Sequence, residues 1–171
     1  MNARLAVVFL LLWCGNAWAQ LNDTEIHTYH LARMIYGEAR GEPDEGMYAV
    51  GWTAENRAKA NLPEYGGPDL CDVIYKQGLK NNGGVRWQYD GAKIPVDTSD
   101  PDWARAQHIA SQVLSGWGKP IYFVTHFCSN RVSGACNWHN SSQTLRYAGT
   151  IGGHDFYMDL RFPVVGYARL H

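Results

Sequence analysis

The chain has 171 residues, 46% of them hydrophobic, which is enough for a domain with its own core. Its formal net charge is −1, with 15 Lys and Arg against 16 Asp and Glu, so the charge gives no electrostatic basis for nucleic-acid binding. No basic cluster in the sequence points to a membrane surface either.

The first nineteen residues have the pattern of a secretory signal peptide. One charge in "MNAR" precedes the short apolar run "LAVVFLLLW", and Ala17 and Ala19 place small residues where a signal peptidase reads. The run is too short to span a bilayer. Trp13 before Cys14 is too bulky for a lipoprotein cleavage site, so we expect no lipid anchor. We expect cleavage after Ala19 and a periplasmic or secreted protein; the alternative is an uncleaved N-terminal anchor.

Two long helices are predicted next, with a break between them. Asn22 can cap the first helix with Glu25 as its reciprocal partner, while Leu21 and Ile26 can close a hydrophobic staple. We expect this helix to run to about residue 40, where a glycine ends it. Pro43 suits the first turn of a second helix that reaches about residue 60.

The rest of the chain predicts one more long helix and a small sheet. A Gly-, Pro- and Asn-rich segment over residues 61–98 is interrupted by a short helix, "DLCDVIYK". A third long helix follows, with Asp100 as its cap and Gly116 at its end. "PIYFVTHF", "TLRYA" and "HDFYM" have strand composition. We therefore expect a helix-dominated α+β fold with a small antiparallel sheet, in one domain over residues 20–171.

One glutamate falls on the apolar side of the first helix. Leu31, Met34 and Ile35 form a stripe, and Glu38 continues it at the spacing of one helical turn. Partial desolvation there raises the pKa of a carboxyl group, and a glutamate still protonated near neutral pH can act as a general acid. In the alternative, the carboxylate reaches solvent or pairs with an arginine. The available arginines are Arg33, Arg40 and Arg57.

Two further acidic residues could belong to the active site, but each also has a simple structural explanation. Glu42 lies four residues after Glu38, but the helix break prevents its placement on the same face. Its simplest interpretation is a helix N-cap or a first-turn acid favoured by the helix dipole. Asp90 in "WQYDG" is the best candidate for a second catalytic carboxylate, or else a turn residue before Gly91.

The cysteines of the expected mature chain predict one disulfide. Removal of the signal peptide leaves Cys71, Cys128 and Cys136, and an oxidising compartment permits a disulfide. An odd count leaves the pairing ambiguous. We favour Cys128–Cys136, which flanks the polar loop "SNRVSGA", with Cys71 as a buried thiol.

The ordered motifs resemble a known family. "ARMIYGEARGEPDEGMYAVGWTAENRA" resembles the opening motif of the SleB-type cell-wall hydrolases, also called spore-cortex-lytic enzymes. "LCDVIYKQG", "WQYDG", "WARAQHIASQVLSG", "YFVTHF" and "TIGGHDFYM" are similar to its later motifs, in the same order. The resemblance covers about residues 31–158. It implies a lysozyme-like fold and cleavage of peptidoglycan glycan strands between N-acetylmuramic acid and N-acetylglucosamine. We expect no cofactor and a monomer.

The resemblance also assigns candidate residues. The family's catalytic glutamate matches Glu38, and several members are lytic transglycosylases. Flat aromatic rings in loops suit sugar faces. His126 and His154 match family positions, but a structural role explains them equally well. Gln88 stands where the family commonly has a serine. The substrate-binding candidates are Trp87, Gln88, Tyr89, His126, Trp138, His154 and Tyr157.

A single well-placed acid favours lytic transglycosylation. Glu38 would protonate the leaving oxygen, and its carboxylate would then take the proton from the C6 hydroxyl to close a 1,6-anhydro ring. A hydrolytic muramidase on the same residues is the first alternative. A zinc site would make a peptidase or amidase conceivable, although no HExxH motif is present. Its ligands would be His126, Cys128, Cys136 and His139. A non-catalytic glycan-binding protein is the last alternative.

Overall fold

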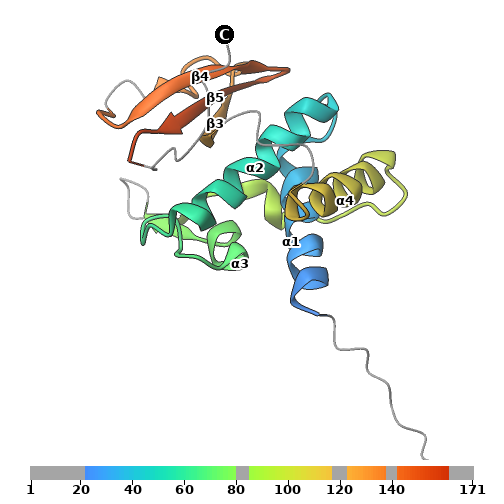
Figure 1. Ribbon diagram of the computed structural model, residues 1–171. Coiled ribbons are helices and arrows are strands. Elements are labelled where there is room, and N and C mark those ends of the chain that lie inside the picture. Colours follow the sequence, from blue (N-terminus) through green and yellow to red (C-terminus); the bar gives the residue numbers. More distant parts are fainter. Residues whose placement is uncertain (1–21, 80–84, 117–122, 138–141, 162–171) are drawn as a thin grey trace, which may run out of the picture.

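The computed structural model describes residues 22–79, 85–116, 123–137 and 142–161. Helices form one part of the molecule and a three-stranded sheet lies over them (Figure 1). The helices are α1 (Asp23–Ala39), α2 (Asp44–Ala60), α3 (Leu70–Ile74) and α4 (Pro101–Leu114), with a 3-10 helix η1 (Asp90–Lys93). The strands are β1 (Gln77–Leu79), β2 (Val85–Trp87), β3 (Val124–Ser129), β4 (Leu145–Ile151) and β5 (His154–Asp159). The predicted helix-dominated α+β class with a small antiparallel sheet is confirmed.

The helix ends follow the predicted capping signals. Asn22 Oδ1 accepts from the Glu25 backbone N–H at 2.9 Å, and Glu25 Oε2 accepts from the Asn22 N–H at 3.0 Å. Gly41 has a φ of 79°, a left-handed conformation that glycine adopts without strain, and it ends α1 as predicted. Asp100 caps α4 through the Asp102 N–H. The predicted staple rests on Leu21, which lies outside the described residues.

The core lies where α1, α2 and α4 pack together. Ile35 from α1, Val50 from α2 and Val113 from α4 are buried, as is Val73 from α3. Non-local packing of these apolar stripes supplies most of the stability of such helices. The end of α1 is therefore a rigid element, and the residues that follow its stripe are positioned by the core.

The sheet is antiparallel and has β5 in its centre, between β3 and β4. The three strands predicted in the C-terminal part of the chain are confirmed, although β3 extends to Ser129. The ladder between β3 and β5 shifts register between Val124 and His126. Side chains of α2 hold this irregularity: Asn56 Nδ2 donates to the Val124 carbonyl oxygen at 2.9 Å, and Arg57 Nε donates to that of Thr125. The sheet is thus fixed to α2 by buried polar contacts.

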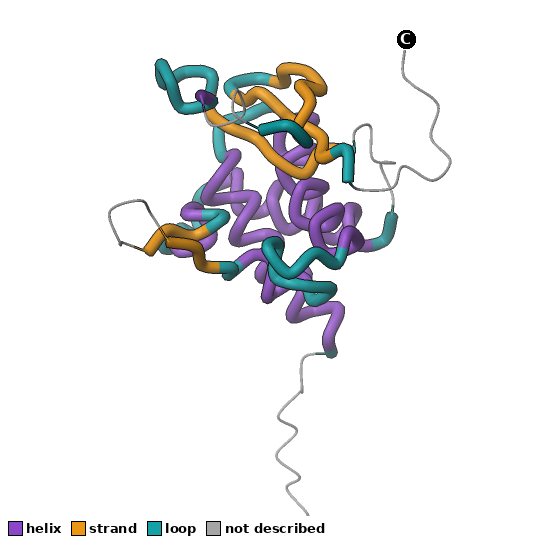
Figure 2. The backbone as a smooth tube through the Cα atoms, turned by 90° about the vertical axis from the view of Figure 1, so that its left-hand side faces the viewer, coloured by secondary structure: helices purple, strands orange, loops and turns teal. Residues whose placement is uncertain are grey.

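A β-hairpin and a 3-10 helix in the Gly- and Pro-rich segment were not predicted. β1 and β2 pair antiparallel over three residues each, and this hairpin projects from the helices (Figure 2). η1 follows β2 and packs on α1. Among the residues that the structure describes, no helix has the length and apolar character needed to cross a membrane.

The cysteine predictions are mostly confirmed. Cys128 and Cys136 form a disulfide with their Cα atoms 5.5 Å apart. Cys71 is a free thiol, but it is half-buried rather than buried, because it lies on the short helix α3 near the surface. The disulfide occupies both sulfur atoms that the alternative zinc site with His126 and His139 requires.

Candidate active site

A pocket of about 450 Å³ lies between the helices and the sheet. Its helical wall consists of Glu38, Arg40, Glu42, Arg57, Gln88 and Asp90. Its sheet wall consists of Phe127, Cys128, Ser129, Arg131, Gly153 and His154. The lining is mainly polar and charged, and it is drawn from segments that are far apart in the sequence.

Glu38 lies in the last turn of α1 and opens into this pocket. The stripe that precedes it, Leu31, Met34 and Ile35, is fully buried, as predicted. The Gly91 backbone N–H donates to Glu38 Oε1 at 2.6 Å. Within the described ranges Glu38 forms no ion pair with an arginine. The alternative in which it is neutralised by a neighbouring arginine therefore does not describe this structure.

Burial raises the pKa of Glu38, as its position on the stripe predicted. The hydrogen bond from Gly91 opposes that rise, because it stabilises the carboxylate. The nearby charge of Asp90 raises the pKa further, and that of Arg57 lowers it. Desolvation is the largest of these effects, so the protonated form of Glu38 is favoured beyond what an exposed glutamate would show.

A close backbone contact between α1 and η1 delivers the Gly91 donor. A Cβ atom added at Gly37 would collide with the backbone of Gly91, and one added at Gly91 would collide with that of Gly37. The two glycines therefore allow α1 and η1 to approach more closely than any other residues would permit. This contact places the Gly91 N–H against Glu38.

Arg57 is a buried cation in the helical wall that the sequence interpretation named only as a possible partner of Glu38. Its Nη1 donates to Gln88 Oε1, and its guanidinium lies 4.9 Å from the centre of the Tyr89 ring. Gln88 also donates from Nε2 to the Glu64 carbonyl oxygen at 2.7 Å. Arg57 continues the buried side of α2 after Val50, so the same periodicity argument would have found it.

Glu42 was wrongly interpreted as a helix cap or first-turn acid. Pro43 is the N-cap of α2, and no side chain caps this helix end. Glu42 is 5% exposed, and its Oε2 accepts from the Gly153 N–H at 2.7 Å. Its Oε1 lies 2.9 Å from Arg131 Nη2. The glutamate thus joins the helical wall to the sheet wall through contacts that only the folded chain creates.

Asp90 begins η1 and lines the pocket with an exposed carboxylate. Its place at the start of a 3-10 helix, directly before Gly91, agrees with the alternative of a turn residue, and the same residue also lines the pocket. The pocket therefore contains three carboxylates, from Glu38, Glu42 and Asp90. The sequence spacing did not predict that Glu42 lies in the same pocket as Glu38.

His154 lies in the sheet wall at the start of β5. Its ring packs edge-on against Phe127 with the centroids 5.2 Å apart. Burial lowers the pKa of His154, so the neutral imidazole is favoured. Among the described residues its Nδ1 has no hydrogen-bond partner. Gln88 and His154 are the two predicted substrate-binding residues that the structure places in the pocket lining.

Other predicted binding residues lie elsewhere. Tyr89 is 1% exposed and Tyr157 is 2% exposed, so neither ring offers a face to a sugar; both pack into the protein interior. His126 is outside the pocket lining, with its Nδ1 2.9 Å from Thr125 Oγ1. Trp87 is half-buried on β2, beneath the Lys93 ammonium group. Trp138 lies outside the described residues.

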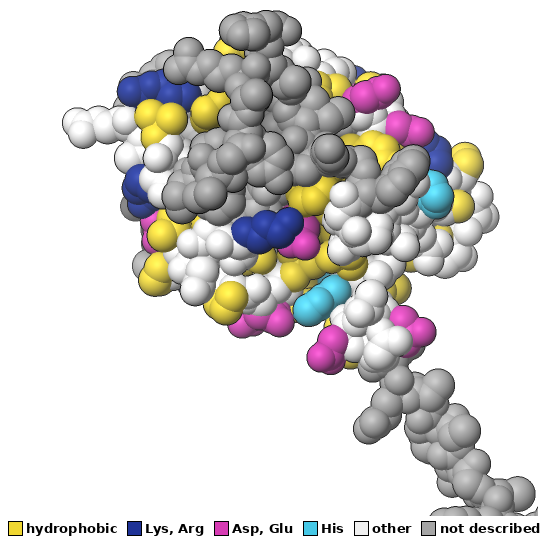
Figure 3. Space-filling model, in the orientation of Figure 1, with side chains coloured by type: hydrophobic (Ala, Val, Ile, Leu, Met, Phe, Trp, Pro, Cys, Tyr) yellow, Lys and Arg dark blue, Asp and Glu magenta, His cyan; other side chains and the backbone are white. Residues whose placement is uncertain are grey.

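The surface around the fold carries mixed charge. On the face shown in Figure 3, acidic and basic side chains of the described residues are interspersed among hydrophobic ones. A mixed distribution creates no strong field of one sign.

Comparison with known proteins identifies the family. The model of the cell wall hydrolase family matches residues 41–157, which is more than half of the chain and includes every pocket residue except Glu38 and Arg40. No curated protein and no solved structure matches the chain. The match agrees with the ordered motifs and with the polar pocket between helices and sheet. The chain therefore belongs to the cell wall hydrolase family, whose domain is of the SleB type.

Proposed function

We propose that this cell wall hydrolase is a lytic transglycosylase with Glu38 as its single general acid and base. The observation that carries the proposal is the setting of Glu38: burial raises the pKa of its carboxyl group while the side chain opens into a pocket of about 450 Å³. A carboxyl group whose pKa is raised by burial is suited to protonate a glycosidic leaving oxygen.

The reaction runs in two proton transfers at one residue. Protonated Glu38 gives its proton to the oxygen between N-acetylmuramic acid and N-acetylglucosamine as that bond breaks. The substrate's own N-acetyl group stabilises the developing positive charge. The Glu38 carboxylate then takes the proton of the muramic acid C6 hydroxyl, whose oxygen closes the 1,6-anhydro ring. Glu38 ends protonated again, and no water is consumed.

The other glutamate of the pocket supports a single-acid route. Both oxygens of Glu42 are engaged, one by the Gly153 N–H and the other by Arg131. A carboxylate that holds two walls together is poorly suited to attack a sugar carbon. Of the two glutamates, Glu38 is therefore the one that is free to transfer protons to and from the substrate.

Asp90 favours one competing function, a hydrolytic muramidase. Its carboxylate lines the same pocket and is exposed, so it could activate a water molecule or attack the sugar. Hydrolysis and transglycosylation share the first step, protonation by Glu38, and differ in the group that supplies the second oxygen.

The remaining pocket residues suit a glycan with anionic peptide stems. Gln88, Ser129 and His154 offer side chains that can hydrogen-bond hydroxyl and N-acetyl groups. Arg40 and Arg131 also line the pocket and can pair with stem carboxylates. Peptidoglycan carries both kinds of group.

Digestion of peptidoglycan in oxygen-18 water separates the two functions. We expect 1,6-anhydromuramyl products without heavy oxygen, because the C6 hydroxyl closes the ring. A muramidase would place the label in each new reducing end. Full label incorporation would contradict the transglycosylase and leave a muramidase on the same pocket. The Glu38→Gln variant serves as the inactive control for contaminating enzymes.

Export remains part of the proposal. The charged start, apolar run and Ala17–Ala19 site support removal of residues 1–19, after which the mature protein would reach the periplasm or medium as a monomer. Amino-terminal sequencing of the protein from culture fractions is the test. A mature protein that still begins at Met1 in the membrane fraction would show an uncleaved anchor instead.

A further inference from the structure

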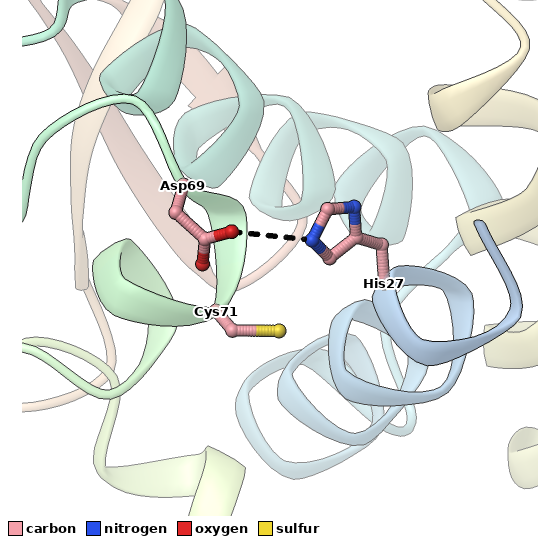
Figure 4. A group of neighbouring side chains, drawn as sticks. All are labelled: His27, Asp69 and Cys71. Carbon is pink, nitrogen blue, oxygen red and sulfur yellow. Dashed lines mark ion pairs between the residues drawn. The ribbon is translucent and has the colours of Figure 1, made fainter. Parts of the chain in front are cut away.

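Three side chains outside the pocket converge from two helices. His27 lies in the second turn of α1, Asp69 is the N-cap of α3, and Cys71 lies in the first turn of α3. One potential ligand atom from each residue lies within 4.8 Å of the other two. Figure 4 shows the imidazole, the carboxylate and the thiol directed toward one common region. The proposed glycan cleavage uses none of them.

The carboxylate of Asp69 is oriented by the backbone. Its Oδ1 accepts from the Asp72 N–H at 2.9 Å, which caps α3. Its Oδ2 is left to face His27 Nε2 at 3.5 Å. One oxygen therefore fixes the group, and the other is available as a ligand, as in metal sites whose carboxylates are held by an outer hydrogen bond.

The arrangement differs from a nucleophile–histidine–acid relay. Such a relay needs the acid on one ring nitrogen and the nucleophile on the other. Here Nε2 of His27 faces Asp69 on the side where the Cys71 thiol lies, while the other ring nitrogen points away (Figure 4). Convergence on the same nitrogen is the geometry of a shared central ion.

We propose that His27, Asp69 and Cys71 bind a zinc ion, with water as the fourth ligand. Imidazole, carboxylate and thiolate are the three ligand types that zinc accepts in tetrahedral sites. Bond lengths of about 2.0–2.3 Å place two zinc ligands roughly 3.3–3.8 Å apart, which the His27–Asp69 separation of 3.5 Å already meets. The side chain of His27 is 32% exposed, so it can move to close the remaining distance while Asp69 keeps its capping hydrogen bond.

Zinc binding would tie the start of α1 to α3. On binding, the Cys71 thiol releases its proton to solvent and becomes a thiolate ligand, and His27 binds as the neutral imidazole. An ion that binds the folded chain and not the unfolded one raises the melting temperature. The ion would bridge two helices at a place outside the glycan pocket.

Zinc titration of the chain by calorimetry tests the site, in a Cys14→Ser background and without reductant, so that Cys71 is the only thiol outside the disulfide. We expect one zinc ion per chain, a higher melting temperature with zinc, and slower reaction of Cys71 with a thiol reagent. Cobalt(II) in place of zinc should show a thiolate charge-transfer absorption band.

Three ligand variants and one control decide the assignment. Cys71→Ser, His27→Gln and Asp69→Asn should each weaken zinc binding by at least about tenfold, since even loss of an outer-shell partner costs that much. Asn retains the capping of α3, so Asp69→Asn keeps the fold. His108→Gln on the exposed side of α4 should bind zinc unchanged. Absence of stoichiometric zinc uptake, or uptake that Cys71→Ser leaves unaltered, would overturn the proposal.

Discussion

Two glutamates of the pocket, four residues apart in the sequence, can be compared. Glu38 lies at the end of α1, and Glu42 lies at the junction where the segment between α1 and α2 meets the sheet wall. At the end of α1, Glu38 receives one backbone hydrogen bond, from Gly91, and burial raises its pKa. At the junction, Glu42 is more deeply buried, but Gly153 and Arg131 engage both of its oxygens. The depth of burial therefore does not decide the role. The partners that each carboxylate finds in the fold do.

This contrast predicts that the two glutamates respond differently to the same substitution. Glu38→Gln should reduce glycan cleavage on the order of 10²–10⁴-fold, because it removes the general acid. The melting temperature should not fall, since Gln fits the same space. Muropeptide release from purified peptidoglycan measures the loss. Glu45→Gln, on the exposed start of α2, is the matched control and should retain full activity. A folded Glu38→Gln variant with most of its activity would remove Glu38 from the mechanism.

The contact between α1 and η1 can be broken from the η1 side. In Gly91→Ala the added methyl group meets the Gly37 backbone, so η1 must move and the donor to Glu38 is displaced. We expect a loss of about 1–3 kcal/mol in the free energy of unfolding, typical of overpacking, together with reduced activity. Gly78→Ala on β1 is the control, because its Cβ meets nothing closer than 3.9 Å. Equal melting curves and rates for both variants would show that the close approach has no importance.

The junction is tested by Glu42→Gln. The amide oxygen can still accept from Gly153, but the charge that pairs with Arg131 is lost. Because the Arg131 side chain is 65% exposed, we expect only about 1–2 kcal/mol of destabilisation by chemical denaturation. Activity should fall less than in Glu38→Gln. Complete inactivity in a folded Glu42→Gln protein would make Glu42 a second catalytic acid and erase the contrast between the two sites.

The parts of this structure that the sequence predicts are those with local causes. The capping of α1 by Asn22 and its end at Gly41 depend on neighbouring residues, and the stripe that carries Glu38 depends on helical periodicity. The hairpin of β1 and β2 has strands of three residues, too short to show a period of two. Elements of that size are determined by their pairing and not by their composition.

The site is predicted less completely because its partners are distant. Glu42 meets Gly153, which is 111 positions further along the chain, and no local pattern indicates that contact. Tyr89 and Tyr157 were assigned to the glycan because of composition and motif, yet both rings are buried. Segments rich in glycine and proline can pack against a core, so loop composition does not imply exposure.

The raised pKa of Glu38 also has a measurable effect on stability. The folded chain holds the Glu38 proton more tightly than the unfolded chain, so the stability contributed by this group falls as pH rises from its ordinary pKa through its raised one. Gln does not titrate. The melting temperature of Glu38→Gln relative to the unmodified protein should therefore increase as pH rises from the ordinary pKa of a glutamate, about 4.3, through the raised one. A constant difference across that range would mean that folding leaves the pKa of Glu38 unchanged.

The smallest effect should come from Asp90→Asn, which changes the end of α1 without touching Glu38. The negative charge of Asp90 raises the pKa of Glu38, so its removal should move the alkaline fall of activity to lower pH, where the general acid loses its proton. Asp90 is exposed, so added salt should screen this interaction and diminish the shift. At the pH optimum the rate should decrease far less than in Glu38→Gln. Rates at several pH values and two salt concentrations provide the test. A loss as large as that of Glu38→Gln, with the fold intact, would instead identify Asp90 as the second carboxylate of a muramidase, and the end of α1 would then hold a pair of acids in place of a single one.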